Sequence, residues 1–220
     1  MSTHTLDFLE AIEHLPEGAM LRLENVSWDE YEQLLDELIM RPGLRVTFNE
    51  GRVEIMRPTP EHEDYKDFIH DMVRLFSIEL GIKTESRGST TYKSRRGLKG
   101  AEPDFCFYVQ NAGAIIGKRR IDLSVDPPPD VVVEIDMSND SLDKFPIYAA
   151  FGVPEIWRYD GKQARIYHLL NESYVEVDPR ISFPILTAQT LTDFLEQSKT
   201  KGQSDALLAF REWVRAQKSA

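Results

Sequence analysis

The chain has 220 residues, of which 41% are hydrophobic and 29% are charged, and its formal net charge is −11. This composition is enough for a folded core and excludes a disordered chain. The negative charge argues against a surface that grips DNA everywhere, but screening beyond roughly 8 to 10 Å allows a local basic patch.

The first predicted element is a helix over residues 28–39. Ser27 and Glu30 form a capping box at its start, and apolar residues recur behind them at helical spacing. Residues 46–55 then alternate apolar and polar side chains around a Gly-containing turn, which predicts a hairpin. Because both arms are short and half polar, we expect this hairpin at a sheet edge with one face in water.

The clearest predicted helix begins at Thr59 and Pro60 and ends at Gly81. An apolar stripe from Tyr65 to Leu80 marks its buried face. Stretches with strand-like composition follow it at residues 82–86, 90–93 and 104–109.

Residues 130–136 are almost continuously β-branched, which predicts a central strand buried on both faces. A helix capped by Ser138 or Ser141 follows, and Pro146 in its first turns can kink it. Residues 153–159 then predict a second strand. Strand, helix and strand make a βαβ unit, for which a right-handed crossover is expected.

Two amphipathic pieces, residues 191–196 and 206–214, lie in the C-terminal part. The apolar stripe of the second docks either on the same core or on a second subunit, so a homodimer is a possible assembly. We expect an α/β fold in three parts, namely an N-terminal segment over 1–26, a domain over 27–197 and a C-terminal helix over 198–220.

Cys106 is the one cysteine of the sequence, so no internal disulfide forms, and its position between Phe105 and Phe107 predicts a buried thiol. No apolar run approaches the about 18 residues that span a bilayer. Residues 1–10 carry neither the basic nor the apolar region of a signal peptide. We therefore expect a cytoplasmic protein with no membrane partner.

Glu134 is the decisive residue, because it interrupts a run of valine and isoleucine. A carboxylate in a fully covered strand costs several kcal/mol to desolvate unless it is paired, hydrogen-bonded or bound to a metal. Strand alternation places Asp136 on the same face, toward the end of the strand where open α/β sheets bind ligands. The alternatives are a buried ion pair for Glu134 and an exposed strand end for Asp136.

Asp104 follows Pro103 and stands at the start of another predicted strand. With Glu134 and Asp136 it can supply the hard oxygen ligands that suit Mg²⁺ or Mn²⁺. The alternative for Asp104 is an ordinary turn or cap after a proline.

Lys144 is the candidate cation, in the helix expected after the Glu134 strand. Its alternative role is a surface pair with Asp140, four residues earlier. His62 and Glu63 begin the long helix off its apolar stripe, where a solvated first turn is the alternative to a functional role.

A resemblance enters with several motifs, which are Pro58-Thr59-Pro60-Glu61-His62, Glu102-Pro103-Asp104, Pro129 to Glu134, Ser138 to Lys144 and Tyr148 to Trp157. Over roughly residues 28–195 the chain resembles a family of restriction-endonuclease-like proteins, a cyanobacterial-type domain of unknown function. That family is similar in fold to the PD-(D/E)XK nucleases. The resemblance implies a mixed sheet flanked by helices and a divalent metal.

On this resemblance, Asp104 and Glu134 match the two metal-binding acids. The usual lysine two residues after the second acid is absent, because Asp136 stands there, and the resemblance implies that Lys144 replaces it. Glu63 or Glu61 matches a further acid from the upstream helix. The implied reaction is metal-assisted hydrolysis of DNA.

Three functions stay open: a Mg²⁺-dependent DNA endonuclease, a catalytically inactive nuclease fold that binds or scaffolds, and a metal-dependent hydrolase of another substrate. The positions of two basic clusters, at residues 93–99 and 118–120, discriminate between DNA binding and the scaffold role. If they flank the acids, DNA contact gains support; solvated loops on the opposite face favour the scaffold.

Overall fold

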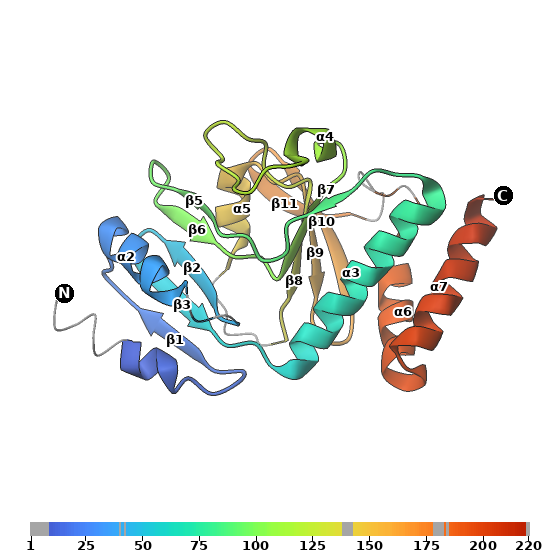
Figure 1. The fold of residues 1–220 in the computed structure, drawn as a ribbon, viewed down its shortest axis with the longest axis horizontal. Helices are drawn as coiled ribbons and strands as arrows, with labels where there is room; N and C mark the ends of the chain where they lie inside the picture. The colour runs from blue at the N-terminus through green and yellow to red at the C-terminus, as the bar shows by residue number, and fades with distance from the viewer. Residues whose placement is uncertain are drawn as a thin grey trace.

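The computed structural model of the chain describes residues 9–39, 41, 43–137, 143–177, 183 and 185–218. Within these ranges, a five-stranded and a six-stranded sheet lie side by side and are flanked by helices (Figure 1). The expected mixed α/β fold is thereby confirmed. Every helix in the described ranges is too short or too polar to span a lipid bilayer.

The first sheet is antiparallel and has the order β1-β3-β2-β6-β5. Its strands are β1 (Met20–Leu23), β2 (Arg45–Asn49), β3 (Arg52–Met56), β5 (Tyr92–Ser94) and β6 (Lys99–Ala101). Helix α2 (Trp28–Leu38) covers one face, and Ser27 and Glu30 form its predicted capping box. Its aromatic side chains pack on the strands, with Tyr31 stacked on Phe48 at 4.6 Å between ring centroids.

Gly100 is required by the close approach of α2 to β6. A Cβ atom at this position would lie 2.1 Å from the hydroxyl oxygen of Tyr31. Any other residue would therefore push the helix away from the sheet.

The prediction that the hairpin forms an edge with a wet face is wrong. Strands β2 and β3 are inner strands of the sheet, because β1 adds to one side and β6 to the other. Their polar side chains Arg45, Thr47 and Glu54 are buried, on the face opposite to α2. That face is turned toward the second sheet, and local sequence patterns carry no information on such long-range pairing.

The second sheet has the order β11-β10-β9-β8-β7-β4. Its strands are β4 (Glu85–Ser86), β7 (Phe105–Tyr108), β8 (Val131–Ile135), β9 (Glu155–Tyr159), β10 (Ala164–Leu170) and β11 (Ser173–Glu176). Among the described strands, only β8 and β9 pair in parallel, and α5 (Phe145–Phe151) lies between them in the chain. Every residue of β8 is buried, which confirms the predicted central strand and βαβ unit.

Helix α5 begins later than predicted, at Phe145, and Lys144 is its N-cap residue rather than a helical residue. Pro146 lies in the first turn, where the missing N–H has no helical partner to lose, so the expected kink has no cause. The proposed caps Ser138 and Ser141 lie outside the described residues. Gly152 ends the helix at a φ of 75°, a left-handed conformation that glycine adopts readily.

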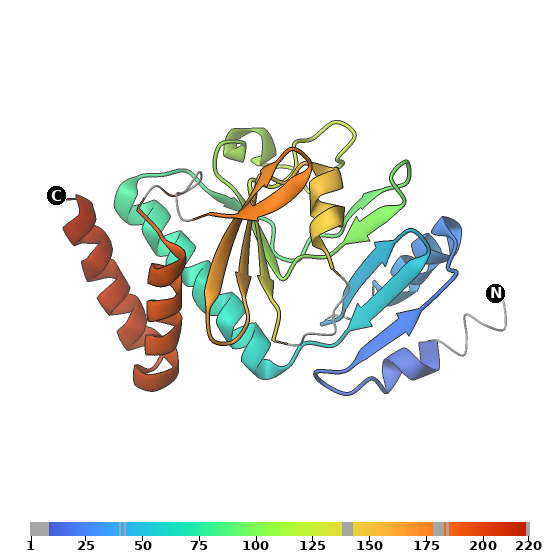
Figure 2. The same cartoon turned by 180° about the vertical axis from the view of Figure 1, so that it is seen from behind.

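Helix α3 (Pro60–Leu80) crosses one face of the second sheet, with the predicted Thr59 cap at its start (Figures 1 and 2). Helices α6 (Ala188–Lys201) and α7 (Gln203–Lys218) pack beside it, and a short helix, α4 (Ala112–Ile115), follows β7. The buried side chains of α7 are Ala206, Phe210 and Val214. They join the core formed with α3, so this stripe docks on its own chain.

Candidate active site

The register of β7 and β8 brings the two predicted acids together. Phe105 pairs with Val133 and Cys106 with Val132 in an antiparallel ladder. One step further along this register, Asp104 stands opposite Glu134. Residues directly opposite in an antiparallel pair project from the same face, so the two carboxylates lie side by side.

Asp104 is a buried, ionised carboxylate at 2% exposure. Its Oδ2 accepts a hydrogen bond of 2.8 Å from the backbone N–H of Ile135 and lies 3.0 Å from Nε2 of His62. Burial alone would raise the pKa of Asp104, but His62, Lys144 and the Ile135 N–H outweigh it and lower that pKa to about 2. Its Oδ1 lies 3.4 Å from Nε of Arg45 and has no hydrogen-bond partner among the described residues.

Glu134 has both carboxylate oxygens engaged. Its Oε2 accepts a hydrogen bond of 2.7 Å from the Lys144 ammonium, and its Oε1 accepts one from the Tyr148 hydroxyl. Burial, together with the negative charge of Asp104, raises the pKa of Glu134 to about 7, although Lys144 opposes this. Two adjacent carboxylates with separated pKa values are typical of a functional site.

Lys144 stays charged beside these acids. Burial lowers its pKa, but the carboxylates of Glu134 and Asp104 outweigh burial and raise it. Asp140, its alternative partner, lies outside the described residues. Lys144 lies beside Glu134. It reaches this acid from the N-cap position of α5 and not from within the helix.

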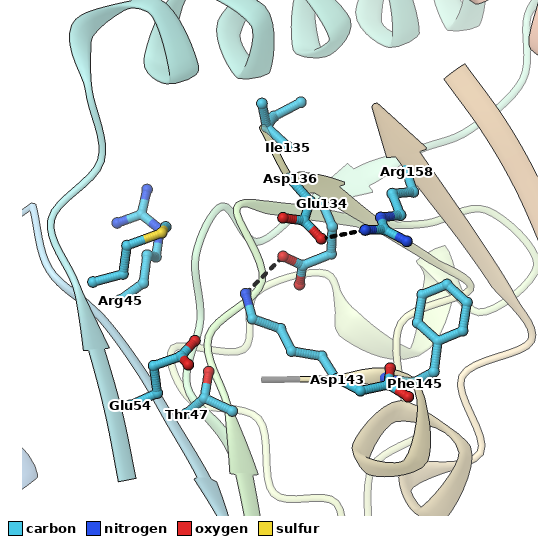
Figure 3. Close-up of a pocket in the computed structure, with 11 residues that line it drawn as sticks. Arg45, Thr47, Glu54, Glu134, Ile135, Asp136, Asp143, Phe145 and Arg158 are labelled. Carbon is cyan, nitrogen blue, oxygen red and sulfur yellow. Dashed lines mark hydrogen bonds and ion pairs between the residues drawn. The ribbon is translucent and has the colours of Figure 1, made fainter. Parts of the chain in front are cut away.

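A cavity of about 150 Å³ opens beside Glu134, between the two sheets (Figure 3), and Asp104 is not among the residues that line it. The polar face of the hairpin lines one side with Arg45, Thr47 and Glu54. The second sheet and the residues before α5 line the other side with Glu134, Asp136, Asp143, Lys144 and Arg158. Charged groups of both signs thus surround a space large enough for an ion and a phosphate group, but not for a duplex.

Asp136 lies on the same face of the strand as Glu134, as predicted, and both line the cavity. Its Oδ2 accepts a hydrogen bond of 2.6 Å from the Arg158 guanidinium (Figure 3). Asp136 is therefore an ion-paired residue of the site and not an exposed strand end.

Glu63 reaches the acid pair through two neighbours, Arg45 and His62, whose Nδ1 lies 3.7 Å from Oε1 of Glu63. Its Oε1 accepts a hydrogen bond of 3.0 Å from Arg45, whose Nε faces Asp104. The Glu63 side chain is 38% exposed and does not line the cavity. His62, in contrast, is buried, so a solvated first turn does not describe it. Glu61, the other upstream acid, is exposed and accepts a hydrogen bond from Tyr65.

Arg45, Glu54 and Tyr148 are site residues that the sequence reasoning missed. Arg45 and Glu54 alternate with apolar residues that pack under α2, and this pattern is also that of a solvated strand face. Tyr148 is one of several aromatic residues in an apolar helix. Only the tertiary structure, in which the first sheet and α5 lie against the second sheet, shows that these side chains face the acids.

A divalent metal fits the acid pair. The buried Oδ1 of Asp104 is a hard donor that accepts no hydrogen bond from the described residues, although the Arg45 guanidinium lies 3.4 Å away, and Glu134 provides a second carboxylate beside it. Mg²⁺ keeps several waters and is commonly bound through one or two carboxylates, so two acids suffice. The described residues contain no cluster of three Asp, Glu, His or Cys side chains arranged to hold a metal.

The first basic cluster lies away from the cavity. Lys93 pairs with Glu32 of α2 at 2.9 Å, and Arg95 pairs with Glu32 and Asp29. Lys93 is paired in register with Gly100, whose face is turned to Tyr31, so this side chain is on the α2 side of the sheet. In the second cluster, Lys118 pairs with Asp126. Lys93, Arg95 and Lys118 are thus paired with surface acids and not with the acids of the cavity.

Comparison with known proteins identifies the family of the chain. The Uma2 family model, described as "Putative restriction endonuclease", matches residues 28–197. The chain belongs to this family. The matched Uma2 region contains Asp104, Glu134 and Lys144, and it confirms the resemblance seen in the sequence motifs.

Among solved structures, the Uma2 chain is similar to the crystal structure of a "putative nuclease belonging to DUF820" from Anabaena variabilis. The two share 16% sequence identity with a TM-score of 0.47, over 73% of this chain and 98% of that chain. No curated protein matches the sequence.

Proposed function

We propose that this Uma2 protein is a Mg²⁺- or Mn²⁺-dependent endonuclease that hydrolyses phosphodiester bonds of DNA. The observation that carries the proposal is the buried pair of Asp104 and Glu134, in which Oδ1 of Asp104 accepts no hydrogen bond from the described residues and the Lys144 ammonium lies 2.7 Å from Glu134. Membership of the family supports a nuclease, and the chemistry of the pair supports the metal.

Asp104 and Glu134 would hold the ion. When bound, a divalent ion stabilises negative charge on a phosphoryl oxygen and lowers the pKa of a coordinated water. The Ile135 N–H fixes Oδ2 of Asp104, which leaves Oδ1 for the ion. The Tyr148 hydroxyl fixes one oxygen of Glu134 in the same way.

Lys144 would supply the positive charge at the reacting phosphate. Its ammonium is held by Glu134, and its three N–H donors allow a second contact to an anionic oxygen. Glu63 would act through Arg45, which it orients toward Asp104, rather than on the substrate.

A catalytically inactive nuclease fold that binds or scaffolds is the second candidate. The pairing of Lys93 and Arg95 with acids of α2, on the face away from the cavity, favours it, as does the net charge of −11. A protein of this kind would retain the fold and the ion pairs without cutting DNA.

Plasmid cleavage discriminates between the two. Purified protein is incubated with supercoiled and linear DNA in Mg²⁺, Mn²⁺ or EDTA, beside Asp104→Asn and Glu134→Gln. Glu155→Gln is the matched control, because Glu155 is equally buried in the same sheet and pairs with His168 away from the cavity. Metal-dependent cutting that both site variants lose and the control keeps supports the endonuclease; no cutting by folded wild-type protein supports the scaffold.

A further inference from the structure

Arg158 lies beside the acid pair because of the parallel pairing of β8 with β9. In this register Arg158 is the partner of Glu134. Its side chain lines the cavity together with Glu134 (Figure 3). Lys144 lines the same cavity. A cation on the neighbouring strand is thus built into the site by the sheet itself, which is a more rigid support than a loop.

The Arg158 guanidinium is anchored by one acid and keeps one donor unpaired within the described residues. One terminal nitrogen donates a 2.6 Å hydrogen bond to Oδ2 of Asp136. Its Nε is buried and has no hydrogen-bond partner within the described ranges. A guanidinium carries five N–H donors in a planar fork, and an unused buried donor is costly unless a ligand satisfies it.

Arg158 is also the most accessible of the three cations around the cavity. Its side chain is 32% exposed, against 12% for Lys144 and 7% for Arg45. Lys144 and Arg45 are more deeply buried against the acids. An anionic group that enters from solvent therefore meets Arg158 first.

We propose that Arg158 binds a phosphate group of the DNA backbone next to the bond that is cut, and that Asp136 is its positioning residue rather than a metal ligand. Arginine suits this role because its fork matches two phosphate oxygens and its charge is permanent. The inference rests on the proposed function for its substrate, but its test measures binding and not cleavage.

Salt dependence of DNA binding tests the proposal. Fluorescence anisotropy follows a short labelled DNA duplex, with Ca²⁺ in place of Mg²⁺, over a series of NaCl concentrations. Each phosphate neutralised by the protein adds about 0.9 to the slope of log affinity against log salt. We expect Arg158→Gln to weaken binding and lower this slope by about 1, while Arg158→Lys keeps the slope.

Arg165→Gln is the matched control. Arg165 is opposite Arg158 in the next strand, its side chain is also 32% exposed, and it pairs with Asp160 at 2.9 Å. It does not line the cavity, so its loss should leave the slope at the wild-type value. Melting temperatures of all variants show that they are folded.

Asp136→Asn separates the two roles of Asp136. If Asp136 positions Arg158, the Asp136→Asn variant binds DNA more weakly than the wild type. Its Mn²⁺ affinity, measured by calorimetry, stays at the wild-type value. A large loss of Mn²⁺ affinity would overturn that part of the proposal.

The proposal is overturned if Arg158→Gln keeps the wild-type slope, or if Arg165→Gln lowers the slope equally. Wild-type protein that binds no DNA overturns both this proposal and the endonuclease. Arg158-dependent binding without cleavage in Mg²⁺ supports Arg158 and contradicts only the endonuclease. Cleavage that Arg158→Gln leaves unchanged in KM and kcat contradicts only Arg158.

Discussion

The ammonium of Lys144 donates a 2.7 Å hydrogen bond to Oε2 of Glu134, although the two residues come from different elements, β8 and the N-cap of α5. This contact connects the candidate cation directly to a candidate metal-binding acid. Lys144 is not a surface lysine, because only 12% of its side chain is exposed.

Lys144→Met should lower kcat for DNA cleavage by about 100-fold or more with little change in KM, because loss of one stabilising charge in a site typically has this effect. Steady-state plasmid nicking measures both constants. Lys199→Met is the control, since Lys199 pairs with Glu196 outside the cavity. Equal activity of the two variants would show that Lys144 is structural.

Asp104→Asn should abolish stabilisation by metal. A ligand that binds only the folded state raises the free energy of unfolding by about 2.7 kcal/mol when its free concentration is about 100 times its Kd. The asparagine oxygen can still accept the bond from the Ile135 N–H, so the variant should fold. Thermal unfolding with and without Mn²⁺ checks this, and a wild-type response in the variant would exclude Asp104 as a ligand.

Metal affinity should rise with pH up to about 7. Burial raises the pKa of Glu134 to about 7, so below that pH the carboxyl is largely protonated and a metal must displace the proton. Mn²⁺ titrations across this range measure the trend. The range from about pH 5 to about pH 7 lies between the ordinary pKa of a glutamate and the raised pKa of Glu134. A Mn²⁺ affinity that stays constant across this range would contradict the prediction.

The metal-free protein should show the opposite trend in stability. A raised carboxyl pKa means that the folded state binds the proton more tightly, so this contribution is present below the ordinary value of 4.5 and is lost as pH rises through about 7. Urea unfolding of wild type and Glu134→Gln, both with EDTA, isolates the contribution. The difference between them should vary with pH across this window and not outside it.

Gly100→Ala should destabilise the protein by about 1 to 3 kcal/mol, the usual cost of overpacking. Its Cβ would lie 2.1 Å from the Tyr31 hydroxyl oxygen. Gly113→Ala in α4 is the control, since a Cβ there meets nothing within 4 Å. Urea unfolding of both variants gives the comparison, and equal stabilities would mean that α2 does not pack against β6 as described.

Local signals in the sequence predicted where helices α2 and α3 begin and where α3 ends. The capping box of Ser27 and Glu30, the Thr59 cap and the Gly81 stop each depend on residues within one turn of helix. The sequence also predicted clearly that strand β8 is buried, because β-branched residues on both faces of a strand indicate that other elements pack on both faces.

The rest of the fold and much of the site depend on pairing between distant segments. The hairpin was predicted at an edge because β2 pairs with β6, which lies about 50 residues later in the sequence, and such pairing has no local signature. The same limit hid Arg45, whose polar side chain in an alternating strand is indistinguishable from a solvated one. Glu134 was found because a lone acid in an apolar run is informative by itself, and Asp104 chiefly through its motif.

The position of the metal is the most direct test of the site. Crystals grown with Mn²⁺ and measured near its absorption edge give an anomalous difference map that locates the ion without any assumption about activity. We predict a peak within coordination distance of Oδ1 of Asp104 and a carboxylate oxygen of Glu134. A peak elsewhere, or none at Mn²⁺ concentrations that saturate binding in solution, would contradict the assignment of this pair as the metal centre.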